Sequence, residues 1–146
     1  MAGLALCPGA LFTALRLIRP DRSIVITSDL ARGTLEETLR RAQQANLPAE
    51  CVIMAEPFVG FAEAADIVTR VRPILAEAGE VVANLSGGST VIQYVVDCIA
   101  IEAIRLNVHT RRVAAVDRRG MEKQRAEPYV LGEIVDIEDT GLRRDD

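Results

Sequence analysis

The residues best suited to chemistry in this sequence form one short stretch, residues 84–90, which reads NLSGGST. Gly87 and Gly88 lack a Cβ atom, so a ligand could approach the backbone closely there. Backbone N–H groups at the start of a helix favour an anion, so the stretch predicts a phosphate site. The alternative is a plain strand-to-helix turn in which small residues only permit packing. The other polar side chains in the stretch, two of which could cap a helix, are Asn84, Ser86, Ser89 and Thr90.

This stretch, called the glycine turn below, lacks the motifs of the common nucleotide-binding loops. The pattern G-x-x-x-x-G-K-[ST] is absent, and so is G-x-G-x-x-G. An ATP-dependent or nicotinamide-dependent enzyme is therefore not expected, and we predict no cofactor.

The glycine turn needs a strand before it and a helix after it. Residues 81–83 are apolar, and residues 91–106 form a long apolar pattern with helical spacing. The same patterns predict strands at 3–7, 23–28, 50–55, 80–84 and 112–116, and helices at 10–19, 34–46, 61–78 and 91–106. Segment 130–137 alternates weakly and could return as an antiparallel edge strand.

Strands that alternate with helices predict an α/β fold. We expect one Rossmann-like, doubly wound domain over residues 1–137, followed by a charged tail, 138–146. The sheet should be mostly parallel, with strand order 3-2-1-4-5 and the antiparallel strand at its edge. Ligands bind such sheets where the order reverses, between the carboxyl ends of strands 1 and 4. We therefore expect Pro8 and Gly9, which follow the first strand, to meet the glycine turn in one crevice.

Local signals predict the ends of two helices and an interruption in one of them. Thr34, with Glu37 three residues later, predicts a capping box at the start of the second helix. Gly79 predicts a left-handed residue that closes the third helix. Pro73 lies inside that helix and predicts a kink or a break.

Composition limits the classes of function. A net charge of −4 and an aromatic content of 3% argue against a grip on long nucleic acid. The three cysteines, Cys7, Cys51 and Cys98, have no metal-ligand spacing, so we expect small core residues, no metal site and a reducing compartment. No signal peptide and no membrane-spanning run is evident, which favours the cytoplasm and argues against a membrane partner.

The helix predicted at 91–106 is apolar around most of its circumference. A helix that lies on one face of a sheet needs apolar residues on about one side only. Because this helix has more, we expect a second copy of the chain to cover it, in a homodimer.

The ordered set of segments resembles the CARF domains of type III CRISPR systems, which bind cyclic oligoadenylates. The family signature is close to N-x-T-G-G-T-K, and residues 84–90 read N-L-S-G-G-S-T, with Ser86 and Ser89 at the two threonine positions and Thr90 in place of the lysine. The resemblance spans nearly the whole chain. The other similar segments are the Pro8–Gly9 turn, Arg19-Pro20-Asp21, Thr27-Ser28-Asp29, Glu56-Pro57-Phe58 and Val116-Asp117-Arg118-Arg119.

The resemblance implies a homodimer that binds one cyclic ligand, most simply cyclic tetra-adenylate, across its twofold axis. Small standalone members are often metal-independent ring nucleases, in which a ribose 2′-OH attacks the adjacent phosphate. The alternative is a sensor that binds without cutting, with a separate effector protein as its partner. On this reading Ser89 and Thr90 are the catalytic candidates. The ligand-binding candidates are Pro8, Gly9, Ser28, Asp29, Asn84, Ser86, Gly87, Gly88, Ser89, Thr90, Arg118 and Arg119.

Four further residues are weaker candidates. Lys123 and Arg125 follow Arg118 and Arg119 and could supply positive charge in place of the family lysine. His109 could act as a base in principle, but it lies between a helix end and a strand start, far from the expected crevice. Cys7 lies at the crevice edge but has no visible activating partner.

Overall fold

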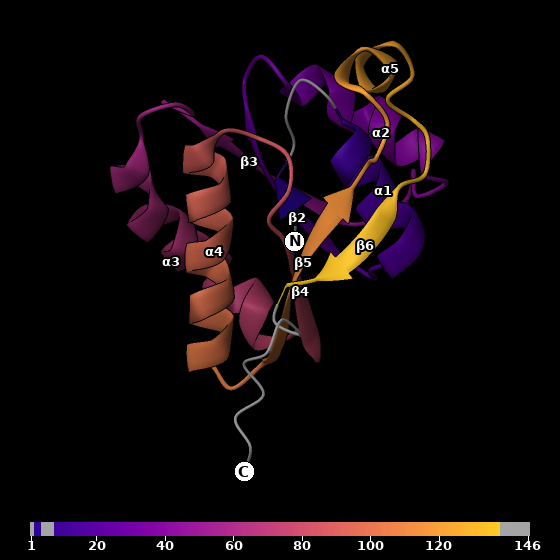
Figure 1. Ribbon diagram of the computed structural model, residues 1–146. Coiled ribbons are helices and arrows are strands. Elements are labelled where there is room, and N and C mark those ends of the chain that lie inside the picture. The colour runs from indigo at the N-terminus through magenta and orange to yellow at the C-terminus, as the bar shows by residue number, and fades with distance from the viewer. Residues whose placement is uncertain (1, 4–7, 138–146) are drawn as a thin grey trace.

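A computed structural model describes residues 2–3 and 8–137 of the chain (Figure 1). The predicted strand at 3–7, Cys7 and the predicted tail at 138–146 lie wholly or largely outside these residues. The strands are β1 (Ala2–Gly3), β2 (Ser23–Ser28), β3 (Ala49–Met54), β4 (Glu80–Asn84), β5 (His109–Val116) and β6 (Glu133–Asp136). The helices are α1 (Gly9–Ile18), α2 (Leu35–Arg41), α3 (Ala64–Ala76), α4 (Thr90–Arg105) and α5 (Met121–Ala126).

The strands lie in the order β3-β2-β1-β4-β5-β6. β2 and β3 form a parallel pair over their whole length. β4, β5 and β6 form a mixed group, in which β4 is parallel to β5 and β6 runs antiparallel to β5. The described part of β1 joins the two groups through two residues. The predicted single α/β domain is confirmed.

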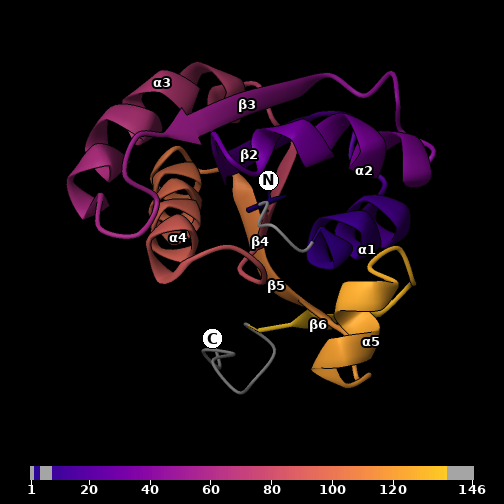
Figure 2. The same cartoon turned by 90° about the horizontal axis from the view of Figure 1, so that it is seen from above.

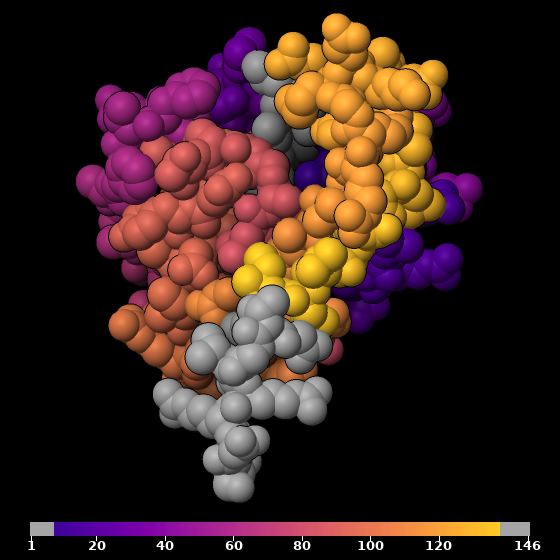
Figure 3. Space-filling model, viewed as in Figure 1, coloured from indigo at the N-terminus to yellow at the C-terminus, as the bar shows by residue number. Residues whose placement is uncertain are grey.

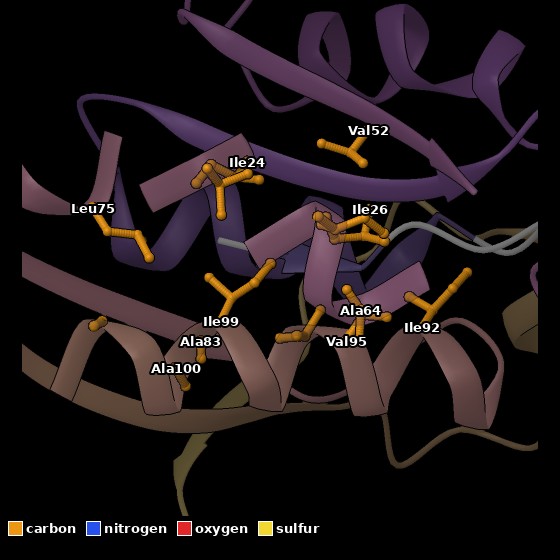
Figure 4. Packing of buried hydrophobic residues seen from close by; sticks show 14 of the residues in the cluster. Ile24, Ile26, Val52, Ala64, Leu75, Ala83, Ile92, Val95, Ile99 and Ala100 are labelled. Carbon is orange, nitrogen blue, oxygen red and sulfur yellow. The ribbon is translucent and has the colours of Figure 1, made fainter. Parts of the chain in front are cut away.

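Helices cover both faces of this sheet. Seen from above, α3 and α4 lie on one face, and α1 and α2 lie on the other (Figure 2). Each face has its own apolar core. The larger core lies under α3 and α4 (Figure 4), and the smaller one lies under α1 and α2 and includes Phe12, Val25 and Ala42.

Helix α4 packs closely against the sheet because its sequence is almost entirely apolar. Seven of its residues are buried, and Val95, Val96 and Ile99 have no exposed surface. A fully buried aliphatic side chain of this size contributes about 1.5–3 kcal/mol relative to exposure. This packing fixes the start of α4, and with it the glycine turn.

Two of the predicted helix ends are wrong. Thr34 does not cap α2, because its backbone is already helical and its hydroxyl group donates to the Ala31 carbonyl at 2.8 Å. Glu37 pairs with Arg40 and Arg41 instead of completing a capping box. Gly79 is not left-handed either, since α3 ends at Ala76 and the last turn is closed by backbone bonds from Glu77.

The structure also refines two segments. α3 continues through Pro73 without a break, so of the two predicted outcomes, a kink or a break, the break is absent. A 3₁₀ turn, Phe61–Glu63, precedes α3. The polar segment after β5, predicted as a loop or short arm, contains the short helix α5. The chain then returns as β6, so the predicted antiparallel edge strand is present.

Candidate functional site: the glycine turn

The glycine turn connects the end of β4 at Asn84 to the start of α4 at Thr90. Gly87 and Gly88 both adopt left-handed backbone conformations, with φ of 82° and 77°. A Cβ atom on Gly88 would lie 2.9 Å from Cγ2 of Ile92. Glycine is therefore required at this position both by conformation and by space.

Side chains of the turn fasten it to β5. Asn84 is buried, and its Oδ1 accepts the backbone N–H of Ser86 at 3.1 Å and the Ser86 hydroxyl group. The Ser86 Oγ in turn accepts the backbone N–H of Ala115 at 2.7 Å. Asn84 and Ser86 therefore hold the turn in shape, and their polar atoms are already engaged.

Ser89 and Thr90, the two catalytic candidates, have different surroundings. Ser89 is the N-cap of α4: its Oγ accepts the backbone N–H of Ile92 at 3.2 Å and donates to the Pro57 carbonyl. Thr90 is exposed, and no hydrogen bond of its hydroxyl group is found among the described residues. Of these two hydroxyl groups, only that of Thr90 is available to a ligand without breaking a bond.

The turn presents backbone donors. Among the described residues, no acceptor receives the backbone N–H of Gly87, Gly88 or Thr90. These groups lie at the positive end of the α4 dipole, and the first turn of α4 contains no acidic residue. Unused N–H groups at an uncompensated helix start are a favourable environment for a phosphate oxygen.

A second helix start faces the same space. A cavity of about 200 Å³ is lined by Gly9, Ala10 and Thr13 of α1 together with Ser86 and Gly87. The first turn of α1 also has no acidic residue and no side-chain cap. Gly9 and the glycine turn, far apart in sequence, therefore line one cavity.

The rest of the cavity wall comes from the end of β5, at Ala115 and Val116, and from the C-terminal arm, residues 117–132. Asp117 and Gln124 line the cavity, together with Pro128. Figure 3 shows α4 on one side of this face of the molecule and the arm on the other. A Cβ atom on Gly9 would lie 2.8 Å from the Pro128 carbonyl oxygen, so the arm lies directly against the start of α1.

Asp117 is the charged residue of the cavity wall, and Arg119 compensates it. Arg119 donates to Asp117 through Nε and through Nη2, at 2.7 Å, and this hydrogen bonding holds the pKa of Asp117 below its usual range. Arg119 also donates to the Glu127 carbonyl at 2.8 Å. Arg119 therefore stabilises the arm, and its guanidinium group is occupied by these hydrogen bonds.

The other predicted cations lie outside the cavity wall. Arg118 is exposed and pairs with Glu133 of β6 at 3.0 Å. Lys123 and Arg125 are exposed on α5. They could reach a ligand larger than the cavity, but the structure does not direct them into it.

Ser28 and Asp29 also lie outside the cavity wall. The Ser28 Oγ accepts the backbone N–H of Ala31 at 3.2 Å, and Asp29 is exposed near Arg32. His109 begins β5, at the opposite end of that strand from Asp117. Cys51 and Cys98 are half-buried, Cys98 packs against the larger core as predicted, and burial raises the pKa of the Cys51 thiol.

Three polar residues that line the cavity were not predicted as site residues. Asp117 directly follows β5, the strand next to β4, and this position was a usable signal. Gln124 donates through Nε2 to the carbonyls of Asp117 and Arg119, at 3.2 and 2.7 Å. Thr13 is buried and accepts the backbone N–H of Gly132 at 3.1 Å. No sequence pattern links these last two contacts to the glycine turn.

An exposed apolar surface begins beside the glycine turn. Phe61 and Tyr94 meet edge to face, with ring centroids 5.4 Å apart, and each remains nearly half exposed. The Pro57 carbonyl, which accepts the Ser89 hydroxyl group, ties this loop to the turn. We call the whole set the α4 surface: Phe58, Val59, Phe61, Tyr94, Ile101 and Ile104.

Comparison with models of known protein families found no matching family, and a search of curated proteins found no matching relative. Within residues 2–3 and 8–137, no helix is both long enough and apolar enough to cross a membrane. The same residues contain no cluster of three or more histidine, cysteine or acidic side chains arranged to hold a metal ion.

Proposed function

We propose that this protein is a Rossmann-like, CARF-type domain that binds a cyclic oligoadenylate, most simply cyclic tetra-adenylate. The observation that supports this best is the cavity between the starts of α1 and α4. Gly87, which lines this cavity, and Gly88 have no acceptor for their N–H groups among the described residues and precede α4, while Gly9 at the start of α1 lines the cavity from the other side; neither helix has an acidic residue in its first turn. Such an environment favours a phosphodiester and needs no metal.

The size of the cavity fits one repeating unit better than a whole cyclic ligand. At about 200 Å³ it is smaller than the usual 300–1,000 Å³ of a small-molecule site. A symmetric ring would place equivalent phosphates in two such cavities related by a twofold axis. The proposal therefore requires a homodimer.

The α4 surface is the proposed dimer contact. Ile101 and Ile104 are 39% and 47% exposed on the outer side of α4, one turn apart. A twofold contact there would cover apolar surface on a helix whose inner side is already packed against the sheet. With the twofold axis along the direction of α4, the two glycine turns would lie at the same end of the dimer, because each turn lies at the start of α4.

The enzymatic form of the proposal is a metal-independent ring nuclease. The ribose 2′-oxygen bonds to the adjacent phosphorus, and the bond from phosphorus to the 5′-oxygen breaks. The 2′-OH proton is lost and the leaving 5′-oxygen gains a proton, which gives a 2′,3′-cyclic phosphate and a 5′-OH end. The protein would hold sugar and phosphate in line and stabilise the developing charge with the N–H groups of the turn. Thr90 is the hydroxyl group best placed to contact the reacting phosphate.

A second candidate is a sensor that binds the same ligand without cutting it and acts through a separate effector protein. Two observations favour it. The Ser89 hydroxyl group is engaged as a helix cap and as a donor to Pro57, and a neutral Thr90 stands where the family motif has lysine.

One experiment tests both candidates. The purified protein is incubated with cyclic tetra-adenylate in EDTA, and binding and products are followed by calorimetry and chromatography. Linear products with a 2′,3′-cyclic phosphate support the nuclease, and tight binding with intact ligand supports the sensor. The absence of any binding contradicts both. Thr90→Lys, which restores the motif, should raise the cleavage rate, and Thr69→Lys, an exposed threonine on α3, is the matched control.

A further inference from the structure

The small cavity at the glycine turn is lined by hydrogen-bond acceptors as well as by a backbone donor. Asp117 and Gln124 of the C-terminal arm line it, and both side chains contain oxygen acceptors. Gln124 donates through Nε2 to two backbone carbonyls, and no donor to its Oε1 is found among the described residues. Gly87 lines the same cavity, and its N–H has no acceptor among these residues. The cavity therefore suits a ligand that carries both an anion and a hydrogen-bond donor.

The carboxylate of Asp117 has room for one more hydrogen bond. Among the described residues its donors all belong to Arg119: the backbone N–H and Nε reach Oδ1 at 3.0 and 3.1 Å, and Nη2 reaches Oδ2 at 2.7 Å. A carboxylate has about four lone-pair sites, so these three donors leave one of them unused. The side chain is 27% exposed, so the arm does not seal it off.

The charge of Asp117 decides which ligand group this carboxylate can meet. Hydrogen bonding from Arg119 holds the pKa of Asp117 below its usual range, so the side chain is ionised at neutral pH. An ionised carboxylate only accepts hydrogen bonds, and it repels a phosphate. It forms a strong, charge-assisted bond with a hydroxyl group. The matching ligand group is therefore a donor that lies next to the phosphate.

One hydrogen bond fixes the arm relative to the glycine turn. The Ser86 Oγ accepts the backbone N–H of Ala115 at 2.7 Å. Gly87 directly follows Ser86, and Asp117 follows Ala115 by two residues. The bond therefore keeps the carboxylate and the backbone of Gly87 at the same cavity, where one ligand can contact both.

We propose that Asp117 makes the site specific for ribonucleotides, by accepting a hydrogen bond from the ribose 2′-OH beside the phosphate bound at the glycine turn. This inference rests on the proposed function, because it requires an oligoadenylate at that turn. In a 3′,5′-linked ribonucleotide, the 2′-OH is on the carbon next to the one that carries the phosphate. The 2′-OH is also the group by which proteins distinguish ribonucleotides from deoxyribonucleotides.

The amino group of adenine is the other donor of such a ligand, and it fits the site less well. The sugar and the length of the base separate it from the phosphate. A cavity of about 200 Å³ is small for that span, since sites for whole small molecules usually exceed about 300 Å³. The 2′-OH needs no such span.

The test compares cyclic tetra-adenylate with a ring that has fluorine in place of each 2′-OH and therefore cannot donate from that position. Binding is measured by filter retention in the cold within seconds of mixing, so that cleavage does not affect the result. We expect the wild-type protein to bind the hydroxyl ring at least about tenfold more tightly. Asp117→Ala should bind the two rings within about twofold of each other. A change in the shape of the arm, or the release of Arg119, alters both affinities alike, so their ratio reports the contact with the 2′ position.

Glu127→Ala is the matched control, because it removes an exposed acidic side chain from the same arm, outside the cavity lining. It should keep the wild-type preference for the hydroxyl ring. An unchanged preference in Asp117→Ala, or an equal loss of preference in Glu127→Ala, would overturn the inference. Equal binding of both rings by the wild-type protein would overturn it as well, and would leave the proposed function supported. Binding of neither ring would contradict the proposed function and, with it, the inference.

Discussion

The two ends of the sheet differ in what they leave unsatisfied. At the carboxyl end, the N–H groups of Gly87 and Gly88 have no acceptor among the described residues, and Gly87 lines a small cavity of about 200 Å³. At the amino end, a larger cavity of about 540 Å³ is lined by apolar side chains of α1 and α3 and by charged residues of both signs, such as Arg22 and Glu80. Larger volume alone therefore does not identify the end that suits an anion. The free backbone donors do, and they lie at the carboxyl end.

The largest expected difference in ligand affinity between the two ends comes from replacing a glycine with a bulky residue. Gly88→Val places a β-branched side chain at φ 77° and against Ile92, so we expect affinity for cyclic tetra-adenylate to fall at least about 100-fold, with a loss of stability of about 1–3 kcal/mol. Gly79→Val is the amino-end control, because a Cβ atom there meets nothing within 4 Å. Calorimetric titration and thermal unfolding measure both effects. Unchanged affinity in Gly88→Val would place the ligand elsewhere.

The next prediction asks whether the carboxyl-end site is shared between two copies. Ile101→Glu puts a charge on the α4 surface, so a dimer formed there should become a monomer and lose most of its ligand affinity. Leu17→Glu, on α1, is the control, since Leu17 is 49% exposed on the other face of the sheet. Sedimentation at micromolar concentration gives the mass. A wild-type monomer, or an unchanged mass in Ile101→Glu, would contradict the proposed interface.

Asn84 should be the residue whose removal most disturbs the shape of the turn. Asn84→Ala removes the buried oxygen that accepts the Ser86 N–H and hydroxyl groups. The free energy of unfolding should fall by about 2 kcal/mol. The control, Asn46→Ala, changes an exposed asparagine, and its free energy of unfolding should stay within about 0.5 kcal/mol of the wild-type value. Urea unfolding measures the difference. Equal losses for both variants would mean that the Asn84 network does not hold the turn.

At the amino end of the sheet, added apolar volume should stabilise the fold instead of destabilising it. Ala78→Leu extends a half-buried side chain into the larger cavity, of about 540 Å³, and we expect a gain in the free energy of unfolding of about 0.5–1 kcal/mol, with ligand affinity unchanged. Ala76→Leu, an exposed position at the end of α3, is the control. A loss of stability in Ala78→Leu would show that the amino end is already well packed.

The smallest effect should come from the Asp117–Arg119 pair, and it should depend on pH. Because Arg119 lowers the pKa of Asp117 in the folded state, the carboxylate stabilises the fold above its unfolded pKa of about 3.9. That contribution is lost as the pH falls through the folded value. Asp117→Asn should therefore lower the unfolding midpoint at pH 7 and match wild type near pH 2.5. A constant difference across this range would assign the effect to packing.

Local signals were sufficient for most of the fold. The β2 and β4 boundaries match their predicted ranges, because β-branched and apolar runs ended by turn residues leave few alternatives. The glycine pair was also readable, since a turn between a strand and a helix needs φ above zero. The capping box at Thr34 and the closing glycine at Gly79 failed, because the 3₁₀ turn before α2 and the early end of α3 depend on packing.

The sequence by itself determined the alternation of strands and helices, the glycine turn and the apolar character of α4, because each depends on neighbouring residues. Only the tertiary structure decided which polar groups remain available in the glycine turn. It engaged Ser86 with Ala115 and Ser89 with Pro57, across separations of 29 and 32 residues. It also formed the larger cavity at the amino end of the sheet, which residues of α1 and α3 line together. Contacts between residues that are far apart in the sequence leave no local pattern, so only the tertiary structure reveals them.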